Sequence, residues 1–242
     1  MTDSVKTINL LQLYPRDMNI YGDWGNTLVL KRRLEWQGYA VNLLEYNPGD
    51  TLPDDVDLIV GGGGQDSGQA KIGEDLVSIG PKLKVLADDG VPMLVICGLY
   101  QQFGHFFRTK DGEVIKGIGL LDVETIGGDE RLIGNIVTSS DDFGLIIGYE
   151  NHSGLTTLGP KAKPLGTLIK GAGNNNTDQT EGARYRNVIG TYLHGSLLPK
   201  NPDIADWLIE QAAMRKFGDH HVAVIEDRFA ELARDVAQRR PR

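Results

Sequence analysis

The chain carries a single cysteine, Cys97, where an apolar run meets a glycine. The run VPMLVI predicts a buried strand, and LYQQFGHFF after Gly98 predicts a helix. A cysteine on such a sharp strand-to-helix turn would have an exposed side chain, and the helix dipole would favour its thiolate. The neighbouring backbone N–H would be free to stabilise an oxyanion. These features point to a nucleophile; the alternative is a buried cysteine that ends a core strand.

A thiolate nucleophile needs a base, and the sequence offers several histidines. His194 follows the apolar run VIGTYL at the expected carboxyl end of a strand, where it could meet the thiolate. His152, in YENHSG, is the second candidate. We expect His105 to pack among aromatic residues and the pair His220 and His221 to be solvated.

Four consecutive glycines follow another predicted strand, in the segment GGGGQD from Gly61 to Asp66. A glycine run can cradle phosphate, but no G-K-[ST] follows it and the G-x-G-x-x-G spacing does not fit. The other use of such a run is a close approach of the backbone to a substrate, which would supply a second oxyanion N–H. A plain flexible turn is the remaining alternative, although four glycines in a row are costly for one.

The first half of the chain alternates predicted strands and helices, which is typical of a parallel sheet with helices on both faces. We therefore predict an α/β fold with an open, mostly parallel sheet flanked by helices, of the flavodoxin-like type. The expected strands occupy 7–14, 39–46, 57–60 and 91–96; the expected helices occupy 27–37, capped by Asn26, and 69–88, interrupted at Gly80-Pro81.

The second half consists of short apolar runs broken by glycine, which predict extra strands joined by turns or hairpins. They occupy 119–128, 131–140, 144–154, 164–171 and 186–195, and the polar segment 171–182 is expected to be a mobile loop. Two closing helices are predicted at 202–216 and 224–240. The second has an apolar face formed by Ile225, Phe229, Leu232 and Val236. We expect one domain over 6–200, with the helices of 201–242 packed on it.

Composition narrows the class of protein. The 242 residues carry a net charge of −8, and 40% of them are hydrophobic. This acidic balance argues against a nucleic acid as partner, because such proteins usually present a basic face. One cysteine excludes an internal disulfide and favours a reducing cytoplasm. The start lacks a signal-peptide pattern, and no run approaches the roughly 20 apolar residues of a membrane span.

The motifs together resemble class I glutamine amidotransferase domains of the CobB/CobQ type, as in cobyric acid synthases. ICGLYQ resembles the nucleophile elbow, IVGGGGQ the oxyanion strand and GTYLHG the histidine motif, and the match runs from Lys6 to Lys200. The segments NIYGDWGN, GGGGQD, RLIGNI and YENHSG further resemble the GatD-type subunits of lipid II isoglutaminyl synthases. Those subunits form heterodimers with a separate MurT-type, ATP-dependent ligase that is related to Mur ligases.

The resemblance implies a glutaminase that releases ammonia from L-glutamine. Cys97 would be the nucleophile, and His194 the base that later protonates the ammonia. The ligase partner would use the ammonia to amidate D-glutamate of lipid II in peptidoglycan synthesis. ATP and magnesium are expected on that partner, and no cofactor or metal on this chain. The resemblance also implies an oxyanion hole from Gly62 or Gly63 with Gly98 and Leu99, an α-carboxylate clamp at Arg131, and Gln101 facing the same pocket.

Two positions depart from the wider class I pattern. The glutamate expected two residues after the histidine is replaced by Ser196, which leaves open what orients the imidazole. The elbow carries Val95 and Leu99 where glycines are usual. The candidates for orienting the imidazole are Glu150, Asp178 and Glu181.

Two other kinds of function stay open from the sequence. The chain could be a glutaminase for another amidation, of the cobyrinate type, or a cysteine hydrolase on the same fold. The pocket near Arg131 decides between these activities, because a glutaminase needs an α-carboxylate clamp. It could instead be a non-catalytic subunit that binds a ligase, with the aromatic residues of YGDWGN in the interface; the alternative for Trp24 is packing beside the mouth of the active site. The non-catalytic function predicts a stable complex but no covalent labelling of Cys97.

Overall fold

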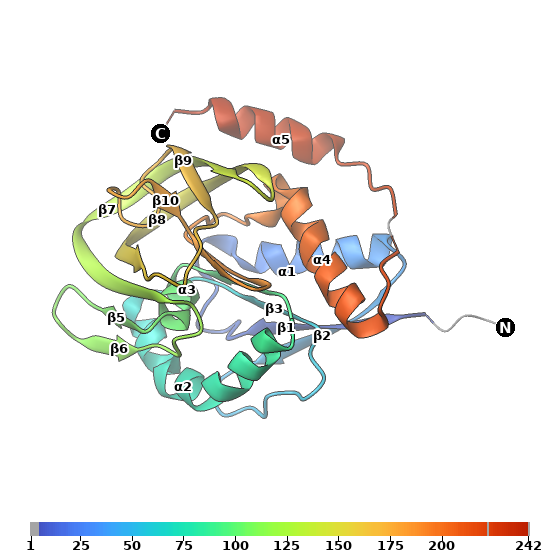
Figure 1. Ribbon diagram of the computed structural model, residues 1–242, viewed down its shortest axis with the longest axis horizontal. Coiled ribbons are helices and arrows are strands. Elements are labelled where there is room, and N and C mark those ends of the chain that lie inside the picture. Colours follow the sequence, from blue (N-terminus) through green and yellow to red (C-terminus); the bar gives the residue numbers. More distant parts are fainter. Residues whose placement is uncertain (1–4, 222, 242) are drawn as a thin grey trace.

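The computed structural model describes residues 5–221 and 223–241, and one of its two sheets has six strands, four of them from the first half of the chain (Figure 1). The strand order is β11-β12-β4-β3-β1-β2. All neighbouring strands run parallel except β11, which is antiparallel at one edge. The strands are β1 (Thr7–Leu13), β2 (Ala40–Tyr46), β3 (Leu58–Gly61), β4 (Met93–Ile96), β11 (Ala183–Tyr185) and β12 (Val188–Thr191). The predicted fold class is confirmed.

Helices cover both faces of this sheet. Helices α1 (Trp24–Trp36) and α4 (Pro202–Phe217) pack together on one face, while α2 (Asp66–Asp88) and the short α3 (Gly98–Phe103) pack on the other (Figure 1). The central strands β3, β4 and β12 are buried throughout. This explains why their sequences are nearly continuous apolar runs rather than alternating patterns.

A second, mostly antiparallel sheet contains the extra strands of the second half. Its order is β10-β9-β7-β5-β6, and β8 pairs with β7 off this path. Strands β7 (Val123–Ser140) and β8 (Gly144–Leu158) form a long ribbon whose register shifts between Gly127 and Leu132. The other strands are β5 (Phe106–Arg108), β6 (Val114–Lys116), β9 (Gly166–Lys170) and β10 (Thr180–Glu181).

Two local predictions need correction. Helix α2 runs through Pro81 without a break, because buried Gly80 packs closely against Ile118 and apolar residues on both sides hold the two halves in line. Helix α1 begins at Trp24, so Asn26 lies inside it and its side chain accepts a hydrogen bond from the Leu198 N–H. Segment 186–195 forms a strand as predicted: β12 makes a hairpin with β11 and also pairs with β4 in the first sheet.

The polar segment 171–182 is tied to the fold at both ends. Asn174 and Glu181 are fully buried, and β10 pairs with β9. The Asn174 side chain donates to Gly182 O and accepts from the Gly182 N–H. The polar composition of the segment 171–182, which predicted a mobile loop, therefore reflects a network of local hydrogen bonds.

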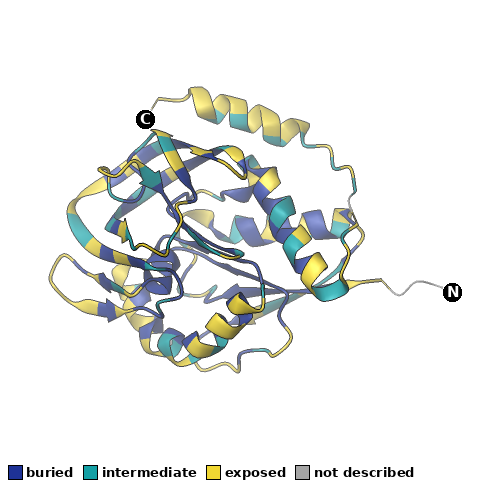
Figure 2. Cartoon of the chain, viewed as in Figure 1, coloured by how far each residue is buried: buried dark blue, intermediate teal, exposed yellow. Residues whose placement is uncertain are grey.

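The two closing helices differ in burial. Helix α4 buries seven residues against the sheet and α1, whereas none of the twelve residues of α5 (Arg228–Arg239) is buried. Figure 2 shows α5 as an exposed rod on the outside of the molecule. The predicted apolar face of the last helix therefore does not join the core, and the proposed domain division stays a prediction. Within the described ranges, no helix has both the length and the apolar content that crossing a membrane requires.

Candidate active site

Four neighbouring strands of the parallel sheet end at one edge, and the residues of the candidate site follow their carboxyl ends. In sheet order β12-β4-β3-β1, the residues that follow the strands include His194, Cys97, Gly63 and Asp23. The carboxyl ends of parallel strands meet at one edge, which is where open α/β sheets bind ligands. The topology thus gathers four chain segments that lie far apart in the sequence.

Cys97 occupies a sharp turn between β4 and α3. Its backbone has φ 49° and ψ −103°, a conformation that a non-glycine residue rarely adopts. The Cys97 N–H donates to Thr191 O at 2.8 Å, and Cys97 O accepts from the Gln101 N–H at 2.9 Å. The residue is 7% exposed, so only a small part of it reaches the cavity. This geometry is that of a nucleophile elbow.

His194 is completely buried beside Cys97. Its backbone N–H donates to Tyr149 O at 2.6 Å. The Tyr21 ring packs edge-on against the imidazole, with ring centroids 5.1 Å apart. Burial by itself would lower the pKa of His194, but the negative charges of Cys97 and Asp23 outweigh it and raise the pKa to about 10. The site therefore favours the protonated imidazolium form of His194.

Asp23 is the orienting group that the sequence did not reveal. Its Oδ2 lies 3.3 Å from His194 Nδ1 and accepts a hydrogen bond from the Gly63 N–H at 2.7 Å. The side chains of Asp23 and His194 are both buried. Asp23 is therefore within ion-pair distance of Nδ1, although neither ring nitrogen of His194 has a hydrogen-bond partner among the described residues. Ser196, at the position of the usual glutamate, donates to Gly22 O at 2.7 Å. Ser196 thus anchors the loop that carries Asp23.

The three acidic residues considered from the sequence bind elsewhere in the fold. Glu150 accepts the N–H groups of Ala172 and Gly173, both at 2.8 Å. Asp178 organises its own loop through Thr180. Glu181 accepts from Thr191 and Tyr192, and burial raises its pKa to about 8. The sequence does not identify Asp23 as a site residue, because nothing in YGDWGN distinguishes it from an aspartate in a turn or at a helix cap.

The glycine run is used differently from the expectation. The Gly63 N–H already donates to Asp23, so it is not free for an oxyanion. Gly64, which the sequence reasoning did not include, lines the cavity beside Cys97. A methyl group on Gly62 would lie 2.4 Å from Met18 O, so Gly62 is confined against the backbone of another loop. Gly98 and Leu99 open α3, and first-turn amides have no partner within a helix.

A cavity of about 370 Å³ opens over Cys97 and contains Arg131 and Gln101 in its wall. Arg131 lies in the β7 bulge, where β-bulges commonly redirect a side chain. Its Nε donates to Asn151 Oδ1 at 2.9 Å and its Nη2 donates to Tyr21 Oη at 3.1 Å. The structure therefore brings the predicted clamp, nucleophile and Gln101 to one cavity.

Two further side chains complete this wall. Gln101 accepts from Gln69 and donates to the Tyr192 hydroxyl, each at 3.0 Å, so its amide is held in a fixed orientation. The His152 ring stacks on Tyr192 with centroids 3.6 Å apart, and its Nδ1 donates to Gly154 O at 2.8 Å. Burial lowers the pKa of His152 to about 3, so the ring is neutral and unsuited as the base. Its Nε2 is buried without a hydrogen-bond partner.

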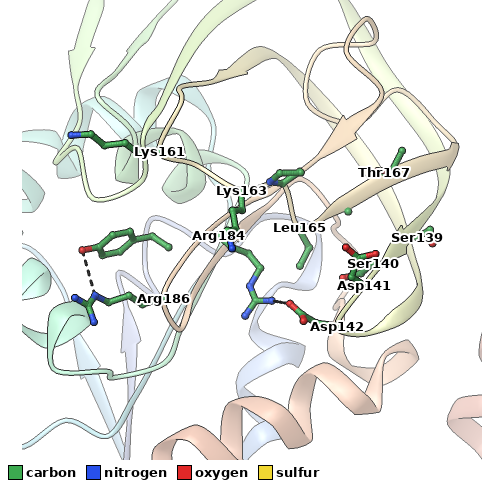
Figure 3. A pocket seen from close by; sticks show the side chains of 13 residues that line it. Ser139, Ser140, Asp141, Asp142, Lys161, Lys163, Leu165, Thr167, Arg184 and Arg186 are labelled. Carbon is green, nitrogen blue, oxygen red and sulfur yellow. Dashed lines mark hydrogen bonds and ion pairs between the residues drawn. The ribbon is translucent and has the colours of Figure 1, made fainter.

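A larger cavity, of about 650 Å³, lies away from these groups and has no nucleophile and base paired in it (Figure 3). Figure 3 shows the Arg184 guanidinium directed at Asp142, with which it forms an ion pair. Arg184 also packs over the rings of Phe143 and Trp207, so it has a structural role. Among the residues that the structure describes, no group of three or more His, Cys, Asp and Glu could hold a metal ion.

Comparison with known proteins identifies the family. The sequence model of the family described as the CobB/CobQ-like glutamine amidotransferase domain matches residues 9–202, which include every residue of the site. This chain belongs to that family. It is a glutamine amidotransferase enzyme subunit, as the resemblance in the sequence predicted.

Two curated relatives are similar over most of their length. The lipid II isoglutaminyl synthase (glutamine-hydrolyzing) subunit GatD of Staphylococcus aureus is 42% identical over 82% of this chain and 82% of its own. The GatD subunit of Streptococcus pneumoniae is 36% identical over 96% of this chain and 89% of its own. A glutamine amidotransferase structure from Thermotoga maritima covers 96% of this chain and 93% of its own, with a TM-score of 0.57 and 15% identity, and so shares the fold.

Proposed function

We propose that this chain is the glutaminase subunit of a lipid II isoglutaminyl synthase. It hydrolyses L-glutamine to glutamate and ammonia, and a MurT-like ATP-dependent ligase uses the ammonia to amidate D-glutamate of lipid II. The observation that supports this most is Cys97 on a strained elbow, beside His194 and Asp23, in a cavity that also contains Arg131. The single thiol and the peptidoglycan substrate fit a cytoplasmic location.

The chemistry follows from the positions of these groups. The Cys97 thiolate attacks the carboxamide carbon of glutamine, and the oxygen takes up negative charge as the carbonyl π bond breaks. The first-turn amides of Gly98 and Leu99, with Gly64 in place of Gly63, stabilise that oxyanion. The His194 imidazolium then donates its proton to the departing nitrogen, which leaves as ammonia. Water attacks the γ-glutamyl thioester with His194 as base, and this releases glutamate.

The remaining residues hold the substrate. Arg131 pairs with the α-carboxylate, since its guanidinium already lines the cavity and matches carboxylate geometry. The unpartnered Nε2 of His152 accepts a hydrogen bond from the substrate α-ammonium. Asp23 pairs with Nδ1 of the His194 imidazolium and so orients the Nε2–H toward Cys97. Ammonia passes to the ligase without meeting bulk water, which would protonate it.

Isotope transfer tests this function. The chain and the ligase subunit are incubated with ATP, lipid II and glutamine labelled with ¹⁵N in the side-chain amide. We expect ¹⁵N in the lipid II product. The Cys97→Ala complex should lose at least about 10⁴-fold of this activity but should still amidate lipid II from ammonium chloride. Glutamine-dependent transfer by Cys97→Ala would contradict the proposal.

A further inference from the structure

Helix α5 is attached to the molecule by polar contacts along one side only. Arg234 donates to Lys200 O, Asn201 Oδ1 and Leu145 O at 2.7 to 3.1 Å. At the start of the helix, Asp227 forms an ion pair with Arg33. Figure 1 shows the helix lying across the outside of the fold, next to the β7–β8 ribbon. These contacts fix which side of α5 faces the body.

The apolar side of α5 is not the side that makes these contacts; it borders the body and is open to solvent. Leu232 and Val236 each lie two residues from Arg234, which puts them roughly 160° around the helix axis from it. Phe229, Leu232 and Val236 are 78%, 59% and 47% exposed. Single exposed apolar residues are ordinary, but a stripe at helical spacing on a helix without any buried residue is not.

This stripe continues into two concave grooves that share Phe229. One groove, of about 350 Å³, has Leu28 and Trp36 of α1 in its wall. The other, of about 360 Å³, lies between α5 and η2 (Leu198–Lys200) and contains Leu232 and Val236. Trp36 is 62% exposed. Concave grooves fit the side chains of a protein, whereas a membrane surface is flat at this scale.

The second groove has a basic border. Lys200 and Arg240 line it, and no carboxylate occurs among its described lining residues, although the whole chain has a net charge of −8. Burial and the nearby Arg240 charge lower the pKa of Lys200, whose Nζ donates to Gly195 O at 3.1 Å. A two-fold contact between copies of this chain would bring two such borders together. The border therefore favours a different protein that has acidic residues around an apolar centre.

Helix α5 lies outside the matched family domain. The matching residues end at 202, and every residue of the catalytic site lies before that point. We infer that the apolar stripe of α5, with its two grooves, is the docking surface for the ATP-dependent ligase subunit, which places apolar side chains in the grooves and carboxylates near Lys200 and Arg240. The inference rests on the proposed function, because that function requires such a partner.

Binding affinity between the two subunits tests this inference. The double variant Leu232→Asp/Val236→Asp should bind the ligase subunit at least about a hundredfold more weakly, since it places charges in the centre of the interface. Arg240→Glu should weaken binding and reduce its dependence on salt. The matched control is Val85→Asp, at a valine on α2 that is 66% exposed, which should bind normally. Biolayer interferometry measures the dissociation constants, and circular dichroism checks the fold.

Each alternative has its own readout. Unchanged affinity of the double variant would overturn the surface assignment. Concentration-dependent dimers of the wild-type chain that the double variant abolishes would overturn it in favour of a second copy. Loss of binding to phosphatidylglycerol vesicles, with normal ligase binding, would overturn it in favour of a membrane. If the wild-type chain does not bind the ligase subunit at all, the proposed function itself fails. Labelling of Cys97 by a glutamine analogue should be the same in all variants.

Discussion

The edge of the parallel sheet and the β7–β8 ribbon contribute different groups to one cavity. At the edge, Cys97, His194 and Asp23 are buried and held by backbone hydrogen bonds and close packing. On the ribbon, Arg131 is solvent-exposed and its partners are neutral side chains. Groups that transfer protons need a fixed geometry and little water. A clamp must exchange its resting partners for a substrate carboxylate.

This comparison predicts a kinetic division. Changes at the sheet edge should lower kcat, because they disturb groups that act in the transition state. Changes on the ribbon should mainly raise KM, because they remove contacts made equally in the ground state and the transition state. Variants that reverse this pattern would remove the distinction between the two regions.

The largest effect in this series is expected at Asp23. Asp23→Asn keeps an acceptor for the Gly63 N–H but removes the charge beside His194. We expect kcat for glutamine hydrolysis to fall by about 10² to 10⁴-fold. Asp23 raises the pKa of His194, so the variant should lose activity at lower pH on the alkaline side of the profile, where the imidazolium gives up its proton.

The control for Asp23→Asn comes from the same loop. Asp17→Asn removes an ion pair with Lys71 at the protein surface and should leave kcat unchanged. Both variants use the same substrate, so the titration of glutamine itself cancels in the comparison. An alkaline limb that does not move in Asp23→Asn would show that Asp23 does not act on His194.

A methyl group at Gly63 should have the next largest effect. It would lie 2.8 Å from His194 Cε1 and 3.1 Å from Cys97 Cβ, so Gly63→Ala forces the two reacting groups apart. A displacement of this kind costs about 10²-fold in kcat. Gly73→Ala on α2, whose added methyl group would make only ordinary contacts at 3.7 Å, is the control. Full activity of Gly63→Ala would mean that the site tolerates more movement than the structure allows.

Arg131 tests the ribbon. Arg131→Gln should raise KM for glutamine by about 10- to 100-fold with little change in kcat, because it removes a charge-assisted contact with the α-carboxylate. Tyr21→Phe removes the resting hydrogen bond of Arg131 but keeps the ring against His194, so it should have little effect. Steady-state kinetics separates the two constants. A fall in kcat alone for Arg131→Gln would place Arg131 with the reacting groups.

The smallest effect is expected at His152. His152→Asn can still donate to Gly154 O but removes the acceptor at Nε2, so KM should rise about tenfold. His152→Gln can place an amide oxygen near the position of Nε2 and should recover part of this loss. Equal KM values for the two variants would show that the unpartnered nitrogen does not contact glutamine.

Much of this architecture could be predicted from the sequence. The apolar runs that became β1, β3 and β4 are buried strands, and the order of strands and helices fixed the fold class. The cavity also unites Cys97 with Arg131, although only a family resemblance, and no local pattern, connected them. The predicted interruption at Pro81 was wrong because tertiary packing compensates for one missing helical hydrogen bond.

The groups that the sequence did not reveal depend on tertiary contacts. Asp23 meets His194 only because β1, β3, β4 and β12 are neighbours in the sheet, and sequence spacing does not encode that order. The Gly63 amide is used by Asp23 for the same reason, which moves the expected oxyanion donor to Gly64. The exposure of the α5 stripe could not be predicted either, since an amphipathic pattern specifies an apolar face without specifying what covers it.

Covalent labelling tests the central claim most directly. The chain is incubated with a diazo-ketone analogue of glutamine, alone and with the ligase subunit, and the adduct is located by intact-mass analysis and peptide mapping. We predict one adduct, on Cys97, which excess glutamine prevents and which forms more slowly in Asp23→Asn. No adduct in either condition, or an adduct that glutamine does not prevent, would contradict a glutamine-hydrolysing site built on Cys97, His194 and Asp23.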